Sequence, residues 1–203
     1  MQYNQDNALL GERVSALAVS PVNGDVAIAT SGGLTIYFAE TEEWKDFTRA
    51  NGLPEDQIVS LSFNEQGGLW AAFLTNGIGY ASPASRYSYW KMVQTKFYWD
   101  KEQRIRQPVE ARGKGLPSNF SNAVCAAGGS VWVGTIAGLG YGRSLRDWNF
   151  LRGRDYERKN AGLWLDTGDK RKNRRAGSLS DSSLLPEDYV TCFYPVPGGM
   201  WVG

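Results

Sequence analysis

The sequence contains no histidine among its 203 residues. That absence excludes triads with an imidazole base, metal sites with histidine ligands and histidine-based pH switches. Only two cysteines are present, Cys125 and Cys192, and both fall within apolar runs. Such cysteines indicate small buried hydrophobic side chains, and a disulfide is the alternative if their Cα atoms lie within about 7 Å of each other.

Net charge and long apolar runs are equally scarce. Lys and Arg number 22 against 21 Asp and Glu, and this near balance gives no general attraction to nucleic acid or to a membrane surface. No apolar run is long enough to span a bilayer, and residues 1–9 show no signal peptide. We therefore expect no nucleic-acid partner, no membrane insertion by this segment and a flexible N-terminus at residues 1–9.

Motifs for catalysis and cofactor binding are also missing. Residues 138–142 resemble half of a dinucleotide-binding fingerprint, but no helical pattern follows them, so close packing at a turn is the better interpretation. Asn119 begins a glycosylation pattern, although its position in a repeated turn favours a structural role. With no nucleophile–base pair and no metal-ligand spacing, we expect no catalytic residues, no metal, no cofactor and no enzymatic activity.

The chain has instead many glycines, many tryptophans and a repeated motif. Its 24 glycines and 8 tryptophans suit numerous turns and large apolar anchors. The clearest copy of the motif is 116–139, where Leu-Pro-Ser-Asn precedes an apolar run, a Gly-Gly turn, Val-Trp-Val-Gly-Thr and Gly-Leu. Apolar runs separated by paired glycines predict successive β-strands joined by tight turns.

Three further copies of the motif begin at Leu10, Leu53 and Leu185. From the opening leucine to the tryptophan position the offsets are 17 (10 to 27, alanine here), 17 (53 to 70), 16 (116 to 132) and 16 (185 to 201). In the first three copies a second tryptophan follows, at positions 44, 90 and 148. One unit is therefore four short strands, and such a unit repeated at about forty residues is typical of a β-propeller blade.

The motif resembles the two-component regulator propeller repeat, which is typical of the periplasmic sensor domains of bacterial hybrid two-component systems. The resemblance covers the chain apart from two insertions, although the second copy departs from it at Ala71-Ala72 and the first lacks its proline and tryptophan. It implies an all-β propeller of four-stranded antiparallel blades and a periplasmic or extracellular location. It further implies a non-enzymatic ligand-binding sensor module that passes a signal to a downstream domain of a longer chain.

The repeat divides the chain into four parts. We predict blade one at 10–52, blade two at 53–115, blade three at 116–184 and part of a fourth blade at 185–203. Because the sequence stops within a second strand, three full blades plus part of a fourth make an incomplete propeller, and we expect a fragment of a longer protein. Tryptophans that recur at one position should pack between blades, so we expect Trp132 to be a core residue.

Blades two and three are longer than blade one because each carries an insertion. The opening leucines are 43, 63 and 69 residues apart (53 − 10, 116 − 53 and 185 − 116), and the surplus falls at 94–114 and 152–183. Both insertions follow the outermost strand of a blade and precede the innermost strand of the next. We therefore expect both on one face of the propeller, close to each other.

The two insertions supply the predicted ligand site. The first contains the aromatic run 97–99 near two arginines, and 152–175 holds nine Lys or Arg against four Asp or Glu, a net charge of +5 (9 − 4). Aromatic rings suit sugar rings, and arginine pairs with carboxylates in bidentate geometry. We predict an oligosaccharide or another anionic or polyhydroxylated ligand, bound without metal or catalysis by Tyr98, Trp99, Arg104, Arg106, Trp164 and Arg171.

Alternatives remain open at this stage. The same face could serve a protein–protein interaction scaffold, and the aromatic residues of the insertions could form a local core beneath a long loop. A propeller polysaccharide lyase is less favoured, since the chain has no histidine.

Overall fold

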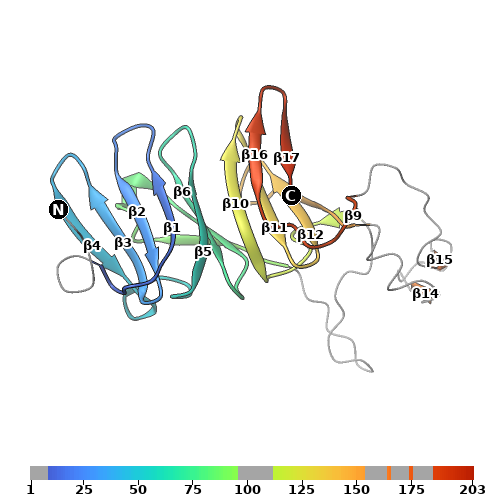
Figure 1. Cartoon of the computed structure of the whole chain (residues 1–203), viewed down its shortest axis with the longest axis horizontal. Helices are drawn as coiled ribbons and strands as arrows, with labels where there is room; N and C mark the ends of the chain where they lie inside the picture. Colours follow the sequence, from blue (N-terminus) through green and yellow to red (C-terminus); the bar gives the residue numbers. More distant parts are fainter. Residues whose placement is uncertain (1–8, 96–111, 154–163, 166–173, 176–184) are drawn as a thin grey trace.

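Our computed structural model describes residues 9–95, 112–153, 164–165, 174–175 and 185–203, and the regular secondary structure of these residues is almost entirely β-strand (Figure 1). The first sheet is an antiparallel meander in the order β1-β2-β3-β4, with bounds Val14–Val19, Val26–Thr30, Gly33–Phe38 and Glu43–Phe47. The second repeats it in the order β5-β6-β7-β8, with bounds Ile58–Phe63, Leu69–Phe73, Ile78–Ala81 and Trp90–Val93. Two 3-10 helices, Arg49–Asn51 and Pro83–Ser85, lie in the connections.

The third sheet has five strands where the repeat predicted four. Its meander β10-β11-β12-β13 is formed by Ser121–Ala127, Ser130–Thr135, Gly138–Gly142 and Trp148–Leu151. The fifth strand, β9 at Arg112–Lys114, comes from the end of the first insertion and pairs with β13. It covers backbone groups on the outer edge of β13 that the blade would otherwise leave to solvent.

Two short hairpins complete the described strands. β16 (Phe193–Val196) and β17 (Gly199–Val202) form a two-stranded sheet beside β10. β14 (Trp164–Leu165) and β15 (Arg174–Arg175) pair within the second insertion. We call the sheets that begin with β1, β5, β10 and β16 blades one, two, three and four.

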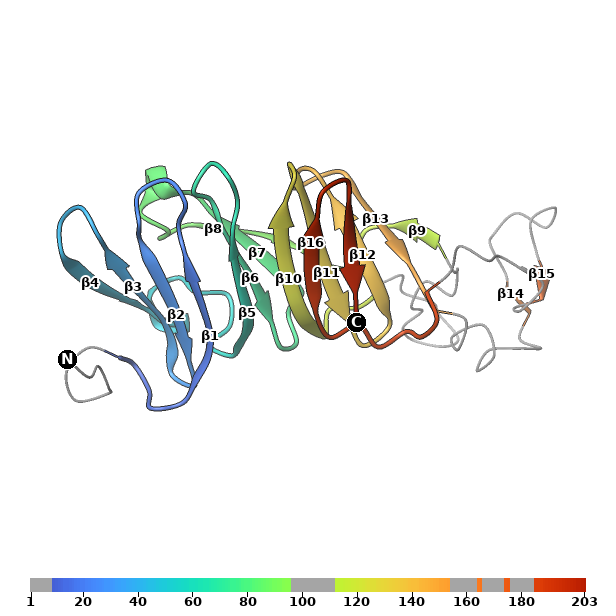
Figure 2. The ribbon, with the colours of Figure 1, turned by 45° about the horizontal axis from the view of Figure 1, so that its top comes forward.

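The blades lie side by side through their first strands, β1, β5, β10 and β16 (Figure 2). In each complete blade the first strand carries a bulge at its second residue, which is Ser15, Val59 or Asn122. Where this residue is polar it reaches the next blade: Ser15 Oγ donates to the carbonyl of Ile58 at 2.6 Å, and Asn122 Nδ2 to that of Val190 at 3.0 Å. The bulges of β1 and β10 therefore each direct one polar side chain at the next blade.

Blade two has valine at the bulge and uses two serines instead. Ser60 Oγ accepts a hydrogen bond from Val124 N at 3.1 Å, and Ser62 Oγ accepts one from Ala126 N at 2.9 Å. Both N–H groups belong to β10 and lie on the side facing β5, so the serines satisfy backbone donors that the β10–β11 ladder leaves unpaired.

Two hydrophobic clusters fill the contacts between the blades. One joins blades one and two through residues such as Leu34, Ile36, Leu61 and Phe73. The other joins blades two and three and includes Trp70, Trp148 and Val133, with the two indole rings 5.9 Å apart. The core is therefore a series of interfaces between sheets rather than one central cluster.

Burial of the recurring tryptophans follows the order of the blades. The second-strand tryptophan lies on the face toward the following blade, and the fourth-strand tryptophan on the face toward the preceding one. The predicted packing between blades is confirmed for the three at 8% exposure or less, Trp70, Trp90 and Trp148. Trp132 is only half-buried against Tyr141, and Trp201 is 70% exposed, because no complete described blade covers either side chain.

A buried polar cluster closes one end of the contact between blades one and two. Asp25 is 3% exposed and accepts hydrogen bonds from Asn23 Nδ2 at 2.7 Å, from Ala39 N at 3.1 Å and from the hydroxyl of Tyr87 at 3.1 Å. Burial of the ring, and then the Asp25 carboxylate, raise the pKa of Tyr87 well above its usual value. The cluster holds the β1–β2 turn of blade one against the β7–β8 connection of blade two.

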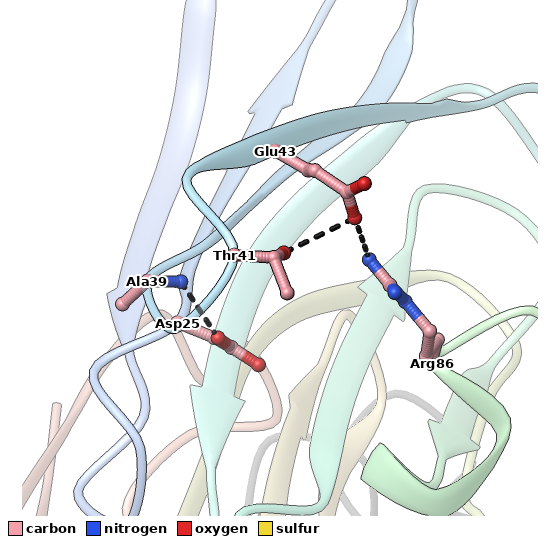
Figure 3. A network of polar contacts seen from close by, with 5 residues as sticks. All are labelled: Asp25, Ala39, Thr41, Glu43 and Arg86. Atoms are coloured by element: carbon pink, nitrogen blue, oxygen red, sulfur yellow. Dashed lines mark hydrogen bonds and ion pairs between the residues drawn. The ribbon is translucent and has the colours of Figure 1, made fainter.

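Two successive left-handed residues shape that connection. Arg86 and Tyr87 have φ of 49° and 58°, which is uncommon for residues other than glycine. Tyr87 is fully buried, whereas Arg86 reaches the surface and forms a 2.6 Å ion pair with Glu43, which also accepts from Thr41 (Figure 3). The hydrogen bond from Arg86, then that from Thr41, hold the pKa of Glu43 below its usual value.

The flexibility expected for residues 1–9 stays a prediction, because Leu9, at 8% exposure, is the only one of them within the described residues. The expectation for the cysteines needs correction. Both cysteines are free, with Cys125 half-buried and Cys192 exposed, so Cys192 is not a core residue. Burial raises the pKa of the Cys125 thiol. Within the described residues, no helix has the length and apolar character needed to cross a membrane.

Candidate functional site

Most of the predicted site residues lie outside the described residues. Tyr98, Trp99, Arg104 and Arg106 fall in 96–111, and Arg171 falls in 166–173. The backbone of Trp164 lies in β14 and pairs with that of Arg175. The site residues themselves therefore stay a prediction, and the structure shows the framework from which both insertions leave.

The acidic or amide residue of the Leu-Pro-x-Asn/Asp motif holds the start of each outer-to-inner connection. Its Oδ1 atom accepts the backbone N–H of a residue just after the outermost strand. The three pairs are Asp56 with Arg49 at 2.7 Å, Asn119 with Thr95 at 2.6 Å, and Asp188 with Gly153 at 2.7 Å. We call Asp56, Asn119 and Asp188 the latch residues. The predicted structural role of Asn119 in the turn is confirmed.

The backbone of two latch residues also binds the glycine of the Gly-Leu or Gly-Ile motif. Asn119 O accepts from Gly77 N at 2.8 Å, and Asp188 O accepts from Gly138 N at 2.6 Å. Both glycines have positive φ, and a Cβ on either would meet a backbone carbonyl at 2.5 Å or less. Each of these two latch residues thus connects three parts of the propeller. They are the end of one blade, the turn between the second and third strands of that blade, and the segment that leads into the next blade.

Further polar contacts fix the point where the first insertion begins. Thr95 is 6% exposed, and its hydroxyl donates to the carbonyl of Leu116. Next to it, Gln94 Nε2 donates to the side-chain oxygen of Asn76, which lies in the β6–β7 turn. The first insertion therefore begins at a hydrogen-bonded segment between blades two and three.

The second insertion begins at a buried arginine. Arg152 is fully buried and donates from Nη1 to Ala137 O at 2.9 Å and from Nη2 to Pro117 O at 3.3 Å. Its guanidinium lies 5.2 Å from the centroid of the Phe150 ring. A charge this deeply buried is tolerated because carbonyl oxygens and a ring face surround it.

The ends of the two insertions adjoin. Arg112, where the described chain resumes after the first insertion, is the register partner of Leu151, two residues before the second insertion leaves the described chain. A Cβ on Gly113 would lie 2.5 Å from the Phe150 ring, so glycine permits this close pairing. Where the second insertion returns, Leu185 forms a parallel bridge with Gly153. Both insertions are thus anchored on the outer strand of blade three.

Sequence reasoning missed two exposed aromatic residues at this end of the blades. Phe120 and Tyr189 each directly follow a latch residue and are 47% and 57% exposed. The signal was the variation between copies: the Leu-Pro-x-Asn/Asp motif recurs in three copies, but the residue after it is Gln57, Phe120 or Tyr189 in turn. A variable residue within a constant frame indicates a position that packing does not dictate.

Charged side chains in the described part give no metal site. No group of three or more Asp, Glu or Cys residues there could hold an ion. Lys114 and Asp147 lie 3.9 Å apart on the surface, with side chains at least 72% exposed.

No protein-family model matches the sequence, and no curated protein matches it significantly. Solved structures do match. The extracellular domain of a hybrid two-component system from B. thetaiotaomicron has a TM-score of 0.53 and 15% identity over 100% of this chain. The fold is a β-propeller.

Two other extracellular domains from the same organism are less similar to this propeller. One, from a hybrid two-component system, has a TM-score of 0.42 and 16% identity over 97% of the chain. The other, from a one-component system, has a TM-score of 0.42 and 14% identity over 95%. The chain spans 27%, 33% and 26% of the three structures, so it corresponds to about a quarter to a third of their length.

Proposed function

We propose that the propeller is a non-enzymatic ligand-binding module of a bacterial extracytoplasmic sensor. Its ligand is an acidic or polyhydroxylated oligosaccharide, held by the two insertions, and a downstream signalling domain of a longer chain reads the binding event. The single observation that supports this best is the pairing of Arg112 with Leu151, because it anchors both insertions on one strand. The similarity in fold to an extracellular sensor domain supports the class of function.

The chemistry of binding follows from the residues of the insertions. Aromatic side chains at 97–99 stack on sugar rings, and Arg104 and Arg106 pair with carboxylates through two parallel hydrogen bonds. The excess of five positive charges over 152–175 attracts an anionic ligand although the whole chain has a net charge of only +1.

Signal transfer would use the latch residues. Asn119 binds the start of the first insertion and Asp188 the start of the second, and both residues lead into first strands at the contacts between blades. A ligand that draws the insertions together would therefore change the geometry of hydrogen bonds that connect successive blades. Such a ligand shifts the sensor only to the extent that it binds one arrangement more tightly than the other.

An oligosaccharide array followed by calorimetry tests the proposal. We expect Trp99→Ala and Arg104→Ala each to weaken binding by about tenfold or more, because each removes one anchor. Matched controls are Tyr89→Ala and Arg143→Ala, both exposed and outside the insertions. Wild-type affinity in both insertion variants would overturn the insertions as the ligand site, and a wild type that binds no oligosaccharide would favour the protein–protein scaffold.

A further inference from the structure

Phe120 and Tyr189 occupy the same position in successive blades. Each directly follows a latch residue, and each latch residue binds the first residues of an insertion, Thr95 or Gly153. The two aromatic residues therefore lie at the end of the propeller from which the insertions leave. The equivalent residues of blades one and two, Arg13 and Gln57, are also exposed but not aromatic.

One short turn holds the backbones of both aromatic residues. The β11–β12 turn binds Phe120 directly, since Ile136 N donates to Phe120 O at 3.2 Å. The same turn binds both neighbours of Tyr189. Val190 N donates to Thr135 O at 3.1 Å, and Gly138 N donates to Asp188 O at 2.6 Å. Asn122, two residues after Phe120, adds a 3.0 Å bond to Val190 O. The backbones at Phe120 and Tyr189 are therefore both held by hydrogen bonds to one turn.

Exposed rings on a fixed backbone suit ligand binding. Phe120 and Tyr189 are 47% and 57% exposed, and Ile136, in the turn that binds their backbones, is 43% exposed. An apolar group of this kind costs solvation free energy unless a ligand or partner covers it. Aromatic side chains lose little conformational entropy on binding because they have only two rotatable χ angles.

We propose that Phe120 and Tyr189 form a stacking platform for a pyranose ring of the oligosaccharide. This inference rests on the proposed function and deepens it, because it places a second contact region on the propeller body beside the insertions. The C–H face of the sugar packs on the rings, and the Tyr189 hydroxyl is available to a sugar hydroxyl. Because the proposed function has the same oligosaccharide bound by the insertions, the ligand has at least two sugar units.

The test uses the whole chain and an array of uronate-containing and neutral oligosaccharides, followed by calorimetry with the oligosaccharide bound best. We expect Phe120→Leu and Tyr189→Leu each to raise Kd by about fivefold to tenfold, and the double variant by more. Tyr189→Phe keeps the ring and should stay within about twofold of wild type. Tyr89→Leu is the matched control, since Tyr89 is 65% exposed in the β7–β8 connection.

The outcomes separate this inference from the function on which it rests. Loss of affinity in the Leu variants, with thermal melts and the Tyr89→Leu control unchanged, supports the platform. Wild-type affinity in both Leu variants, alongside lost binding in Trp99→Ala, overturns the platform and keeps the proposed function. Failure of the wild type to bind any oligosaccharide on the array overturns both.

Discussion

The contact between blades one and two and the contact between blades two and three share a geometry but not their residues. At the second-strand position that faces the following blade, blade one has Ala27 and blade two has Trp70, both nearly inaccessible. Trp70 meets Trp148 of blade three, whereas Trp90 of blade two packs on Phe73 of its own blade. In the contact between blades one and two the fully buried ring of Tyr87 packs instead on Phe38 and Phe63.

The polar parts of the two contacts differ in the same way. Blade two offers Ser60 and Ser62 to the edge of β10, while the equivalent positions of blade one are Ala16 and Ala18. Blade one compensates with the bulge residue Ser15 and with the bond between Tyr87 and Asp25. The repeat therefore fixes positions, and neighbouring residues make up the lost volume and hydrogen bonds when one position changes.

The largest expected effect comes from removing a ring that both sides of a contact bury. Trp148→Ala should lower the free energy of unfolding by about 3–5 kcal/mol, because it leaves a cavity against Trp70. Trp132→Ala should cost less, since Trp132 is half-buried, but still more than Trp99→Ala. Denaturant melts of the three variants measure this order, and equal losses would contradict it.

Enlarging Ala27 tests whether the first contact has room for a second tryptophan. Ala27→Trp should destabilise the protein by about 1–3 kcal/mol, because the side chain is fully buried among close-packed neighbours. In a double variant, Tyr87→Ala should recover part of the loss. Additive losses in thermal or denaturant melts would show that Tyr87 does not occupy the space that Trp70 fills in the other contact.

Alanine substitutions of Ser60 and Ser15 compare the polar arrangements of the two contacts. Ser60→Ala should cost about 1–3 kcal/mol, because it leaves the N–H of Val124 without a partner. Ser15→Ala should lower the free energy of unfolding by about 0.5–1.5 kcal/mol. The effect is smaller because a carbonyl that loses one hydrogen bond, here that of Ile58, costs less than a buried N–H left without a partner. Denaturant melts compare the two, and a larger loss for Ser15→Ala would reverse the interpretation.

The buried hydroxyl of Tyr87 predicts a dependence on alkaline pH. Burial and Asp25 raise the pKa of Tyr87 above the unfolded value of about 10. The folded state therefore keeps the proton more tightly, and this contribution to stability is full below pH 10 and declines as pH rises above it. Tyr87→Phe should flatten that decline in melts taken between about pH 9 and 11, at a cost near neutral pH of about 1 kcal/mol. An unchanged alkaline profile would contradict it.

The surface ion pair should give the smallest effect. Glu43→Gln removes the charge that meets Arg86, and both side chains are about half exposed. Because the pKa of Glu43 is lowered, its contribution is present above the unfolded pKa and is lost as pH falls through the lower folded value. The difference from wild type in thermal melts should disappear at high salt. A loss that persists at high salt would show that Glu43 acts through something other than charge.

Much of the fold could be predicted because the residues of each motif copy determine its strands and turns locally. The unit of four short strands expected in the first two copies matches β1–β4 and β5–β8, since alternating apolar residues and glycine turns fix strand bounds within one hairpin. β9 was missed because Arg-Gly-Lys carries no strand signal of its own and pairs only where β13 offers an open edge. The latch residues could be located but not explained, as their partners lie between 7 and 35 residues away.

The sequence by itself determined the period of the propeller, the order of its strands and the positions that tryptophan and the latch residues occupy, because these depend on spacing along the chain. Only the tertiary structure decided which of those residues are buried. Trp70 and Trp201 hold the same place in the repeat, yet they are 4% and 70% exposed. Burial depends on whether another sheet covers the face, and that is a property of the assembled blades rather than of any single copy of the motif.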